Sequence, residues 1–222
     1  MWSFSMDNYK HYLFDVDGTL IDTERTGVLS LVKTIKELME QDMSYDEAYG
    51  YFGVPSGKVA PMLGFGDSEL FGRRWEENFI ELQHLMKPFD GVEEVLVRLK
   101  QRGAHLACIT SRNRFEFSKD PYMLEMVHLF DEAICAEDTV KHKPDPEPVL
   151  EYMRRMERRT GEKVLPGECL YLGDTVHDFE CGSGAGCDFA LADWHCRGLR
   201  GIPAKYRFTT ASELQDIVDG QA

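Results

Sequence analysis

The chain has 222 residues, of which 43% are hydrophobic and 29% charged, so it is large enough for a globular core and its composition does not indicate disorder. Its formal net charge of −14 disfavours general binding to nucleic acid or to anionic membranes, because both require clustered Lys and Arg to neutralise phosphates. No apolar stretch is long enough to span a membrane and residues 1–12 lack a secretory signal, so we expect a cytoplasmic protein.

The first predicted element is a strand over residues 11–15, an aromatic and aliphatic run that a glycine loop ends. Asp15 and Asp17 come at its carboxyl end, in the sequence Asp-Val-Asp-Gly-Thr. Gly18 lets the backbone bend there, so that both carboxylates can reach one site. Of two such carboxylates, one can act as a nucleophile while the other donates a proton and later accepts one.

Residues from about 24 to 88 contain no convincing strand and at least three helical segments. Ser44-Tyr-Asp-Glu47 has the form of a capping box and predicts the start of a short helix. Phe71, Trp75 and Phe79 form a stripe at helical spacing, which predicts core packing and not base stacking. We therefore predict an all-helical insertion at residues 23–88, within a core made of residues 1–22 and 89–222.

After the insertion, short runs of strand-forming residues alternate with helical patterns, which predicts a parallel sheet covered on both faces. The predicted strands are residues 105–110, 132–136, 169–173 and 189–192. Gly103 is placed to end the first helix. The apolar stripes of the two helices are Val92, Val95, Leu96 and Leu99, then Val149, Leu150, Met153 and Met156.

The six cysteines form no C-x-x-C pair, and several lie in apolar runs. This pattern fits reduced, buried thiols better than disulfides or a zinc site. The residues concerned are Cys108, Cys135, Cys169, Cys181, Cys187 and Cys196.

Polar residues with possible chemistry follow the predicted strands, at the edge where open parallel sheets bind ligands. They are Asp15, Asp17, Thr110, Ser111, Lys143, Asp174 and Asp178. Each is a weak signal alone: Asp-x-Asp-Gly is usually a loop, and a Lys before Pro is usually a solvated charge, with Lys141 as a nearby competitor. Four converging carboxylates would repel one another without a cation, and oxygen ligands suit Mg²⁺.

These motifs, in this order, resemble those of the haloacid dehalogenase-like hydrolases. That family carries Asp-x-Asp-Gly-Thr, a Thr or Ser closing a second strand, a Lys before Pro, and Gly-Asp-x-x-x-Asp, which this chain has at residues 15–19, 110, 143–144 and 173–178. The resemblance implies a three-layer α/β/α core with a Rossmann-like parallel sheet, and the insertion matches the small helical cap of the family.

The resemblance also implies roles for these residues. Asp15 is the expected nucleophile and Asp17 the acid and base, while Thr110 and Lys143 bind the phosphoryl group and Ser111 can add its backbone N–H. Mg²⁺ is the expected cofactor. Its expected ligands are the side chains of Asp15 and Asp174, the backbone carbonyl of Asp17, and Asp178 directly or through water.

Within the family, an Asp at position 17 favours a phosphatase over carbon–halogen and phosphonate hydrolases, which lack it. Sugar-phosphate mutases keep this Asp, but tend to carry Glu-Asp where this chain has Gly173-Asp174. A third alternative is an inactive binding or regulatory protein on the same fold, although no motif residue is lost.

The chain looks most like the phosphoglycolate phosphatase and pyrophosphatase group, from its Asp-Gly-Thr-Leu-Ile-Asp-Thr and Lys-Pro-Asp-Pro sequences. We therefore expect a small phosphorylated metabolite as substrate. Residues 53–66 form the expected specificity loop, in which Lys58 can meet an acidic leaving group. Arg112 and Arg114 are further candidates for specificity on the core side.

Overall fold

The structure is a computed structural model that describes residues 9–52, 54, 56–195 and 201–218. Its main sheet consists of β1 (His11–Phe14), β4 (His105–Ile109), β5 (Glu132–Ile134), β6 (Cys169–Gly173), β7 (Asp188–Ala192) and β8 (Tyr206–Phe208). Within the described residues these six strands are all parallel and lie in the order β5-β4-β1-β6-β7-β8. The predicted α/β fold with a parallel sheet is confirmed.

The central strand β1 lies between β4 and β6. Its last residue, Phe14, is level with Cys108 of β4 and Leu172 of β6. All four residues of β1 are buried, as expected for a parallel strand covered on both faces. The carboxyl ends of three neighbouring strands therefore meet at one edge of the sheet.

The sequence patterns do not predict the edge strand β8. It has three residues, of which only Phe208 is buried, and the exposed Arg207 interrupts its apolar character. Hydrogen bonds to β7 hold these residues in an extended strand that their own sequence does not predict.

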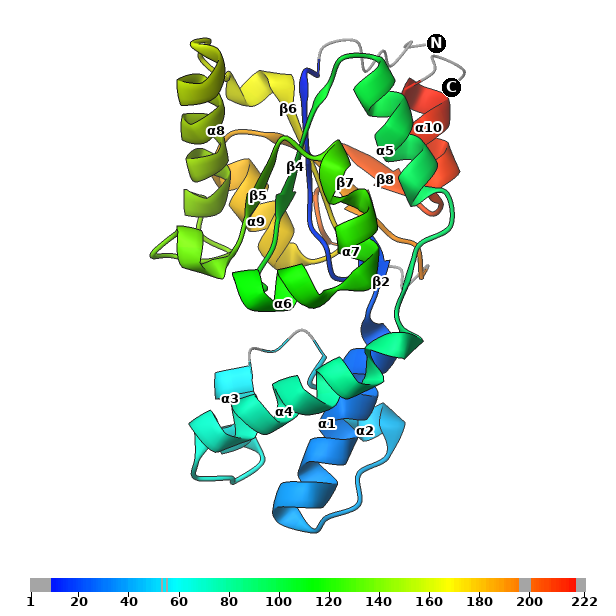
Figure 1. Ribbon diagram of the computed structural model, residues 1–222, viewed down its shortest axis with the longest axis vertical. Coiled ribbons are helices and arrows are strands. Elements are labelled where there is room, and N and C mark those ends of the chain that lie inside the picture. Colours follow the sequence, from blue (N-terminus) through cyan, green and yellow to red (C-terminus); the bar gives the residue numbers. More distant parts are fainter. Residues whose placement is uncertain (1–8, 53, 55, 196–200, 219–222) are drawn as a thin grey trace. The chain divides into compact units, whose positions relative to one another are not determined.

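Helices cover both faces of this sheet (Figure 1). They are α5 (Val92–Gln101), α6 (Arg114–Lys119), α7 (Pro121–Met126), α8 (Glu147–Thr160), α9 (Val176–Gly184) and α10 (Ala211–Val218). α8 and α9 pack on the face that carries Leu13 and Tyr171. α5 and α10 contact each other beside Phe14 and Leu172, so the sheet residues alternate between the two layers with the strand period of two.

One predicted helical stripe needs a correction. In α8, Leu150 is 48% exposed, so its assignment to the buried face is wrong, and the buried Tyr152 takes its place. A residue one position after Val149 lies about 100° away around a helix, and this is enough to turn it towards solvent. In α5 the prediction is confirmed, and Gly103 follows its end at a φ of +80°. The buried residues of α5 are Val92, Val95, Leu96 and Leu99.

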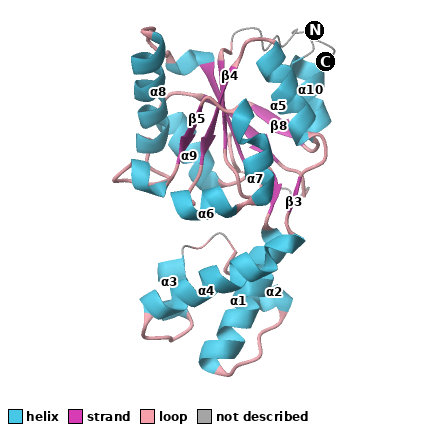
Figure 2. Ribbon diagram, in the orientation of Figure 1, coloured by secondary structure: helices cyan, strands magenta, loops and turns pink. Residues whose placement is uncertain are grey.

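The chain divides into two compact units, Met1–Ile21 with Pro88–Ala222, and Asp22–Lys87. Each boundary between the two units lies one residue before the position predicted from the sequence. The second unit contains four helices, drawn in cyan in Figure 2: α1 (Glu24–Met39), α2 (Tyr45–Tyr49), α3 (Ser56–Met62) and α4 (Ser68–Leu82). β2 (Ile21–Asp22) and β3 (Lys87–Pro88) pair in a separate two-stranded sheet. The prediction that residues 23–88 contain helices and no strand is therefore wrong at β3. The short 3-10 helices are η1 (Gln83–Leu85), η2 (Val127–Leu129), η3 (Ala136–Asp138) and η4 (Pro166–Glu168).

The helical unit has its own apolar core, in which Phe71 is buried and Trp75 packs against it. The indole N–H of Trp75 donates to the Ser30 hydroxyl at 2.8 Å, so Phe71 and Trp75 serve packing as predicted, while Phe79 is half-buried. The capping box at Ser44 is present, with its hydroxyl accepting from the Glu47 N–H. Residues 53–66 are not a plain loop as expected, because α3 occupies residues 56–62.

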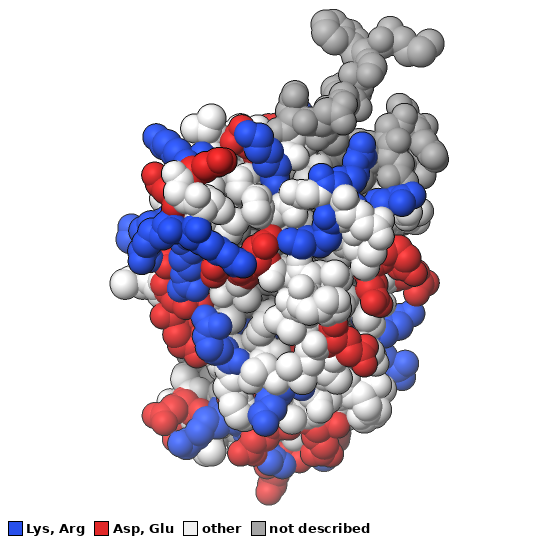
Figure 3. Space-filling view, turned by 45° about the horizontal axis from the view of Figure 1, so that its top comes forward, with Lys and Arg blue, Asp and Glu red and all other residues white. Residues whose placement is uncertain are grey.

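Cysteines and charged side chains have distinct places in this fold. Five cysteines are buried and free, and Cys196 lies outside the described residues. No helix among the residues described is long and apolar enough to cross a membrane. On the face drawn in Figure 3, basic and acidic side chains are interspersed. Exposed pairs such as Lys10 with Glu168, at 2.6 Å, fit this mixture.

Candidate active site

The loop after β1 brings two carboxylates to the centre of the sheet edge. The Asp15 N–H still bonds to the Leu172 carbonyl of β6 at 2.9 Å, so Asp15 continues the strand. The chain then turns at Gly18, whose φ is +83°, a value that favours glycine. A Cβ at Gly18 would lie 2.3 Å from Oδ2 of Asp174, so only glycine allows this approach of the loop to β6.

The loop after β6 supplies the other two predicted carboxylates. Asp174 follows the last residue of β6, and Asp178 is in the first turn of α9. Thr175 caps α9 in a capping box, in which its hydroxyl accepts the Asp178 N–H, and the same hydroxyl donates to Oδ2 of Asp178 at 2.5 Å. The phenolic O–H of Tyr171 donates to Oδ1 of Asp178 at 3.1 Å. The orientation of Asp178 is therefore fixed by β6 and by the start of the helix.

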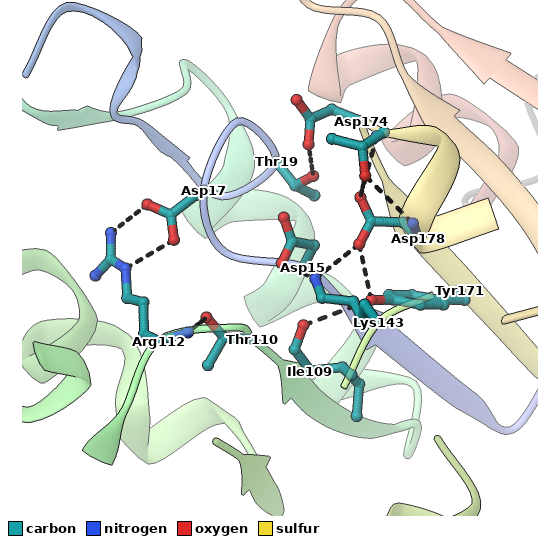
Figure 4. A network of polar contacts seen from close by, with 11 residues as sticks. Asp15, Asp17, Thr19, Ile109, Thr110, Arg112, Lys143, Tyr171, Asp174 and Asp178 are labelled. Carbon is teal, nitrogen blue, oxygen red and sulfur yellow. Dashed lines mark hydrogen bonds and ion pairs between the residues drawn. The ribbon is translucent and has the colours of Figure 1, made fainter. Parts of the chain in front are cut away.

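Lys143 joins the two groups of carboxylates. Its ammonium lies 2.5 Å from Oδ1 of Asp15 and 2.7 Å from Oδ1 of Asp178, and its side chain is 7% exposed (Figure 4). The competing Lys141 is exposed and pairs with Asp145 at 3.3 Å. The structure thus brings Lys143, and not Lys141, to the residues that follow β1 and β6.

Three of these carboxylates are close enough to hold one ion. Asp15, Asp174 and Asp178 are all buried, and each offers an oxygen within 4.8 Å of the other two. Burial raises the pKa of Asp15 to about 7, although Lys143 opposes the shift. Burial, with repulsion from Asp178 and Asp15, raises the pKa of Asp174 well above its ordinary value. Burial acts in the same direction on Asp178, but Lys143 and the hydrogen bonds from Thr175 leave its pKa below the ordinary value.

The end of β4 contributes Thr110, which is buried and adjoins the exposed Ser111. The Thr110 N–H bonds to the Ile134 carbonyl at 3.0 Å, so the pairing with β5 continues to this residue. Its hydroxyl oxygen accepts the N–H of Arg112 at 3.1 Å. The hydroxyl proton remains available for a ligand oxygen.

Asp17 points to a partner different from that of Asp15 (Figure 4). Both of its carboxylate oxygens accept from the guanidinium of Arg112, at 2.8 and 2.7 Å. The third guanidinium nitrogen of Arg112 donates to the buried Asp120 at 2.7 Å. Asp120 is not among the residues selected from the sequence, because an Asp before a Pro is indistinguishable there from an ordinary helix cap.

The three residues expected to determine specificity have different surroundings. Arg112 lies in the ion pairs just described. Arg114 is largely exposed, and its guanidinium pairs with Asp138 at 2.5 Å. Lys58 is exposed on α3 of the helical unit. Tyr171 and Thr175 orient Asp178 but are not among the site residues predicted from the sequence. Tyr171 lies in an apolar run that is typical of a core strand, and Thr175 has the place of an ordinary helix cap.

Comparisons with known proteins bear on the family and the fold. The family model described as haloacid dehalogenase-like hydrolase matches residues 12–192. A phosphoglycolate phosphatase of Aquifex aeolicus is 29% identical over 93% of this chain and 95% of its own length. The pyrophosphatase PpaX of Halalkalibacterium halodurans is 26% identical over 95% and 97%. The solved structure of a HAD-superfamily hydrolase of subfamily IA from Geobacter sulfurreducens PCA superposes with a TM-score of 0.74, covering 98% of this chain and 100% of its own, at 22% identity, which indicates a shared fold.

Proposed function

Because this chain belongs to the haloacid dehalogenase-like hydrolase family, we propose that it is a phosphatase that hydrolyses a small phosphomonoester or pyrophosphate through a phosphorylated Asp15. The curated relatives named phosphoglycolate phosphatase and pyrophosphatase support these two substrate classes. We also propose a cytoplasmic location, which the five buried free cysteines among the described residues support.

The observation that carries the proposal is the contact of Lys143 with Asp15 at 2.5 Å, at the carboxyl edge of the sheet. A carboxylate that attacks phosphorus must approach a dianionic group, and a buried ammonium offsets that repulsion. Burial and repulsion from Asp178 hold Asp15 at a raised pKa, so a further cation beside it would favour the ionised form that attacks.

The residues present fit a magnesium ion. Three carboxylates and one ammonium leave two negative charges in the cluster of Asp15, Asp174, Asp178 and Lys143, and oxygen donors are those that Mg²⁺ prefers. When bound, the ion would polarise a phosphoryl oxygen and neutralise developing charge. We propose Asp15, Asp174 and the backbone carbonyl of Asp17 as ligands, with Asp178 binding directly or through water.

The protein groups then divide the chemistry. Asp15 attacks phosphorus and Asp17 gives its proton to the departing oxygen; Asp17 then takes a proton from the water that releases phosphate. The Thr110 hydroxyl and the Ser111 N–H would donate to phosphoryl oxygens, and Lys143 would stay beside both the nucleophile and the transferred group.

The first experiment measures phosphate release from p-nitrophenyl phosphate with Mg²⁺ and with EDTA. We expect activity only with the metal, and none in Asp15→Asn. Asp188→Asn is a matched control, because Asp188 begins β7 at the opposite end of the strands and pairs with Lys205 at 2.6 Å. Metal-independent turnover, or full activity of Asp15→Asn, would contradict the proposal.

A panel of substrates tests the substrate class. Phosphoglycolate, pyrophosphate and glucose 1-phosphate are compared by their kcat/KM values for release of phosphate. Formation of glucose 6-phosphate in place of free phosphate would identify a mutase. Lys58→Ala tests the proposed role of α3: a rise in KM for phosphoglycolate and pyrophosphate, but not for glucose 1-phosphate, is expected if this side chain meets an acidic leaving group.

A further inference from the structure

Arg112 is a buried cation without an assigned task in this chemistry. It is 8% exposed, and each of its three guanidinium nitrogens donates to a carboxylate. Two nitrogens bind the two oxygens of Asp17, and the third binds Asp120 (Figure 4 shows the pair with Asp17). The guanidinium is thus engaged by the protein itself, which argues against the specificity role that its place after β4 suggests.

The other end of this arrangement is fixed by α7. Asp120 is 2% exposed, and its Oδ1 accepts the N–H groups of Tyr122 and Met123 in the first turn of α7, at 2.9 and 3.1 Å. Its second oxygen is left for Arg112. The geometry of Asp120 is therefore set by a helix start and does not depend on a substrate.

The backbone of Arg112 is also held on both sides. Its N–H donates to the Thr110 hydroxyl at 3.1 Å, and its carbonyl accepts the N–H of Ala136 at 2.9 Å. The side chain of Asp17, in contrast, is 36% exposed. A planar guanidinium that binds both oxygens fixes the plane of the carboxylate, which a point charge does not do.

We propose that Arg112, held by Asp120, is a positioning residue for Asp17. It fixes the plane of the carboxyl group, so that a lone pair not bound by Arg112 carries the proton that passes to the leaving oxygen and that, in the second step, returns from water. This inference rests on the proposed function, because it requires Asp17 to be the acid.

The test uses the chemistry of the leaving group. An alkoxide needs a proton in order to leave, whereas 2,4-dinitrophenolate does not, so only alkyl phosphates depend strongly on the acid. The value of kcat/KM covers the steps up to departure of the leaving group. We expect Arg112→Lys to lower kcat/KM for ethyl phosphate at least about 10-fold, and for 2,4-dinitrophenyl phosphate less than about 3-fold, as part of the 10²–10⁴-fold typical of general acids.

Two further variants support the measurement. Asp120→Asn keeps an oxygen for α7 but loses the charge that holds Arg112, and should shift the ratio of the two kcat/KM values in the same direction. Arg155→Lys is the matched control, because Arg155 also binds carboxylates, with Asp138 and Glu151 both at 2.7 Å, but none belongs to the site. Its ratio should equal that of the unchanged protein.

The outcomes separate the possible roles. Equal losses on both substrates in Arg112→Lys would mean a structural or phosphoryl-binding role and would overturn the inference. A loss on phosphoglycolate without a loss on ethyl phosphate would mean that Arg112 binds the carboxylate of the substrate, and would also overturn it. Asp17→Asn tests the premise: if it shows no dependence on the leaving group, the acid role fails as well. If it does show one and Arg112→Lys and Asp120→Asn do not, the inference alone fails.

Discussion

Removal of the divalent cation should make the stability of the protein depend strongly on pH between 6 and 8. Without the ion, the cluster of Asp15, Asp174 and Asp178 has the ammonium of Lys143 as its cation, and this ammonium pairs with Asp15 and Asp178. A carboxyl group whose pKa is raised in the native state keeps a proton that the unfolded chain has released. The proton that such a carboxyl group keeps therefore stabilises the native state at low pH, and the free energy of unfolding falls as the pH rises and the proton is lost.

The magnitude follows from the pKa values. With a native pKa of about 7 against an ordinary value near 3.8, Asp15 by itself reduces the free energy of unfolding by about 1.4 kcal/mol between pH 6 and 8. Asp174, whose pKa burial also raises, adds a loss of the same sign. His11 acts in the opposite direction, because burial lowers its pKa to about 4. Its neutral native form gains at most about 0.8 kcal/mol over this range, less where solvent screens it, so the carboxylates dominate.

The assay is urea denaturation at pH 6, 7 and 8, in EDTA and in excess Mg²⁺. The difference between the two conditions removes the contribution of His11, which is the same in both. We expect the stabilisation by Mg²⁺ to grow by at least about 1.4 kcal/mol from pH 6 to 8, equivalent to roughly tenfold tighter binding. In Asp174→Asn the growth should be smaller. A stabilisation by Mg²⁺ that is constant or falls with pH would refute this explanation of the cluster.

Three other changes have definite expected results. Lys143→Met leaves buried carboxylates without their cation, so the metal-free protein should lose about 3–5 kcal/mol in urea denaturation; a loss below about 1 kcal/mol would show that the ion pair is not sustained in solution. Gly18→Ala forces its Cβ against Asp174, and kcat/KM should fall roughly 100-fold; unchanged kinetics would mean that the loop can relax. His11 beside Tyr152 is neutral in the native state, so the free energy of unfolding should fall by up to about 3 kcal/mol because of His11 as the pH falls from 6.5 to 4. Urea denaturation of His11→Gln tests this: if its free energy of unfolding depends on pH as that of the unchanged protein does, other groups cause the loss.

The local patterns of the sequence were sufficient for most of the core. Strand formers in short runs, and apolar residues at the helical period in α5, determine which segments are strands and which are helices, because each pattern places its apolar side chains on the buried faces. Once the strands are parallel, residues that follow them must meet at one edge. For this reason Asp15, Thr110 and Asp174 could be predicted as neighbours from the sequence.

The choice of partner for each charged side chain was decided by the tertiary structure. Arg112 and Asp17 are 95 positions apart, and nothing in either local sequence indicates that they pair. Asp120, the cap residue of α7, pairs with Arg112 because the fold brings the start of that helix within reach of the guanidinium. Similarly, β8 has too few apolar residues to be predicted as a strand from the sequence, and it is a strand because it pairs with β7. Local periodicity determines which face of an element is buried, whereas an ion pair depends on how separate segments approach one another, and this only the folded chain fixes.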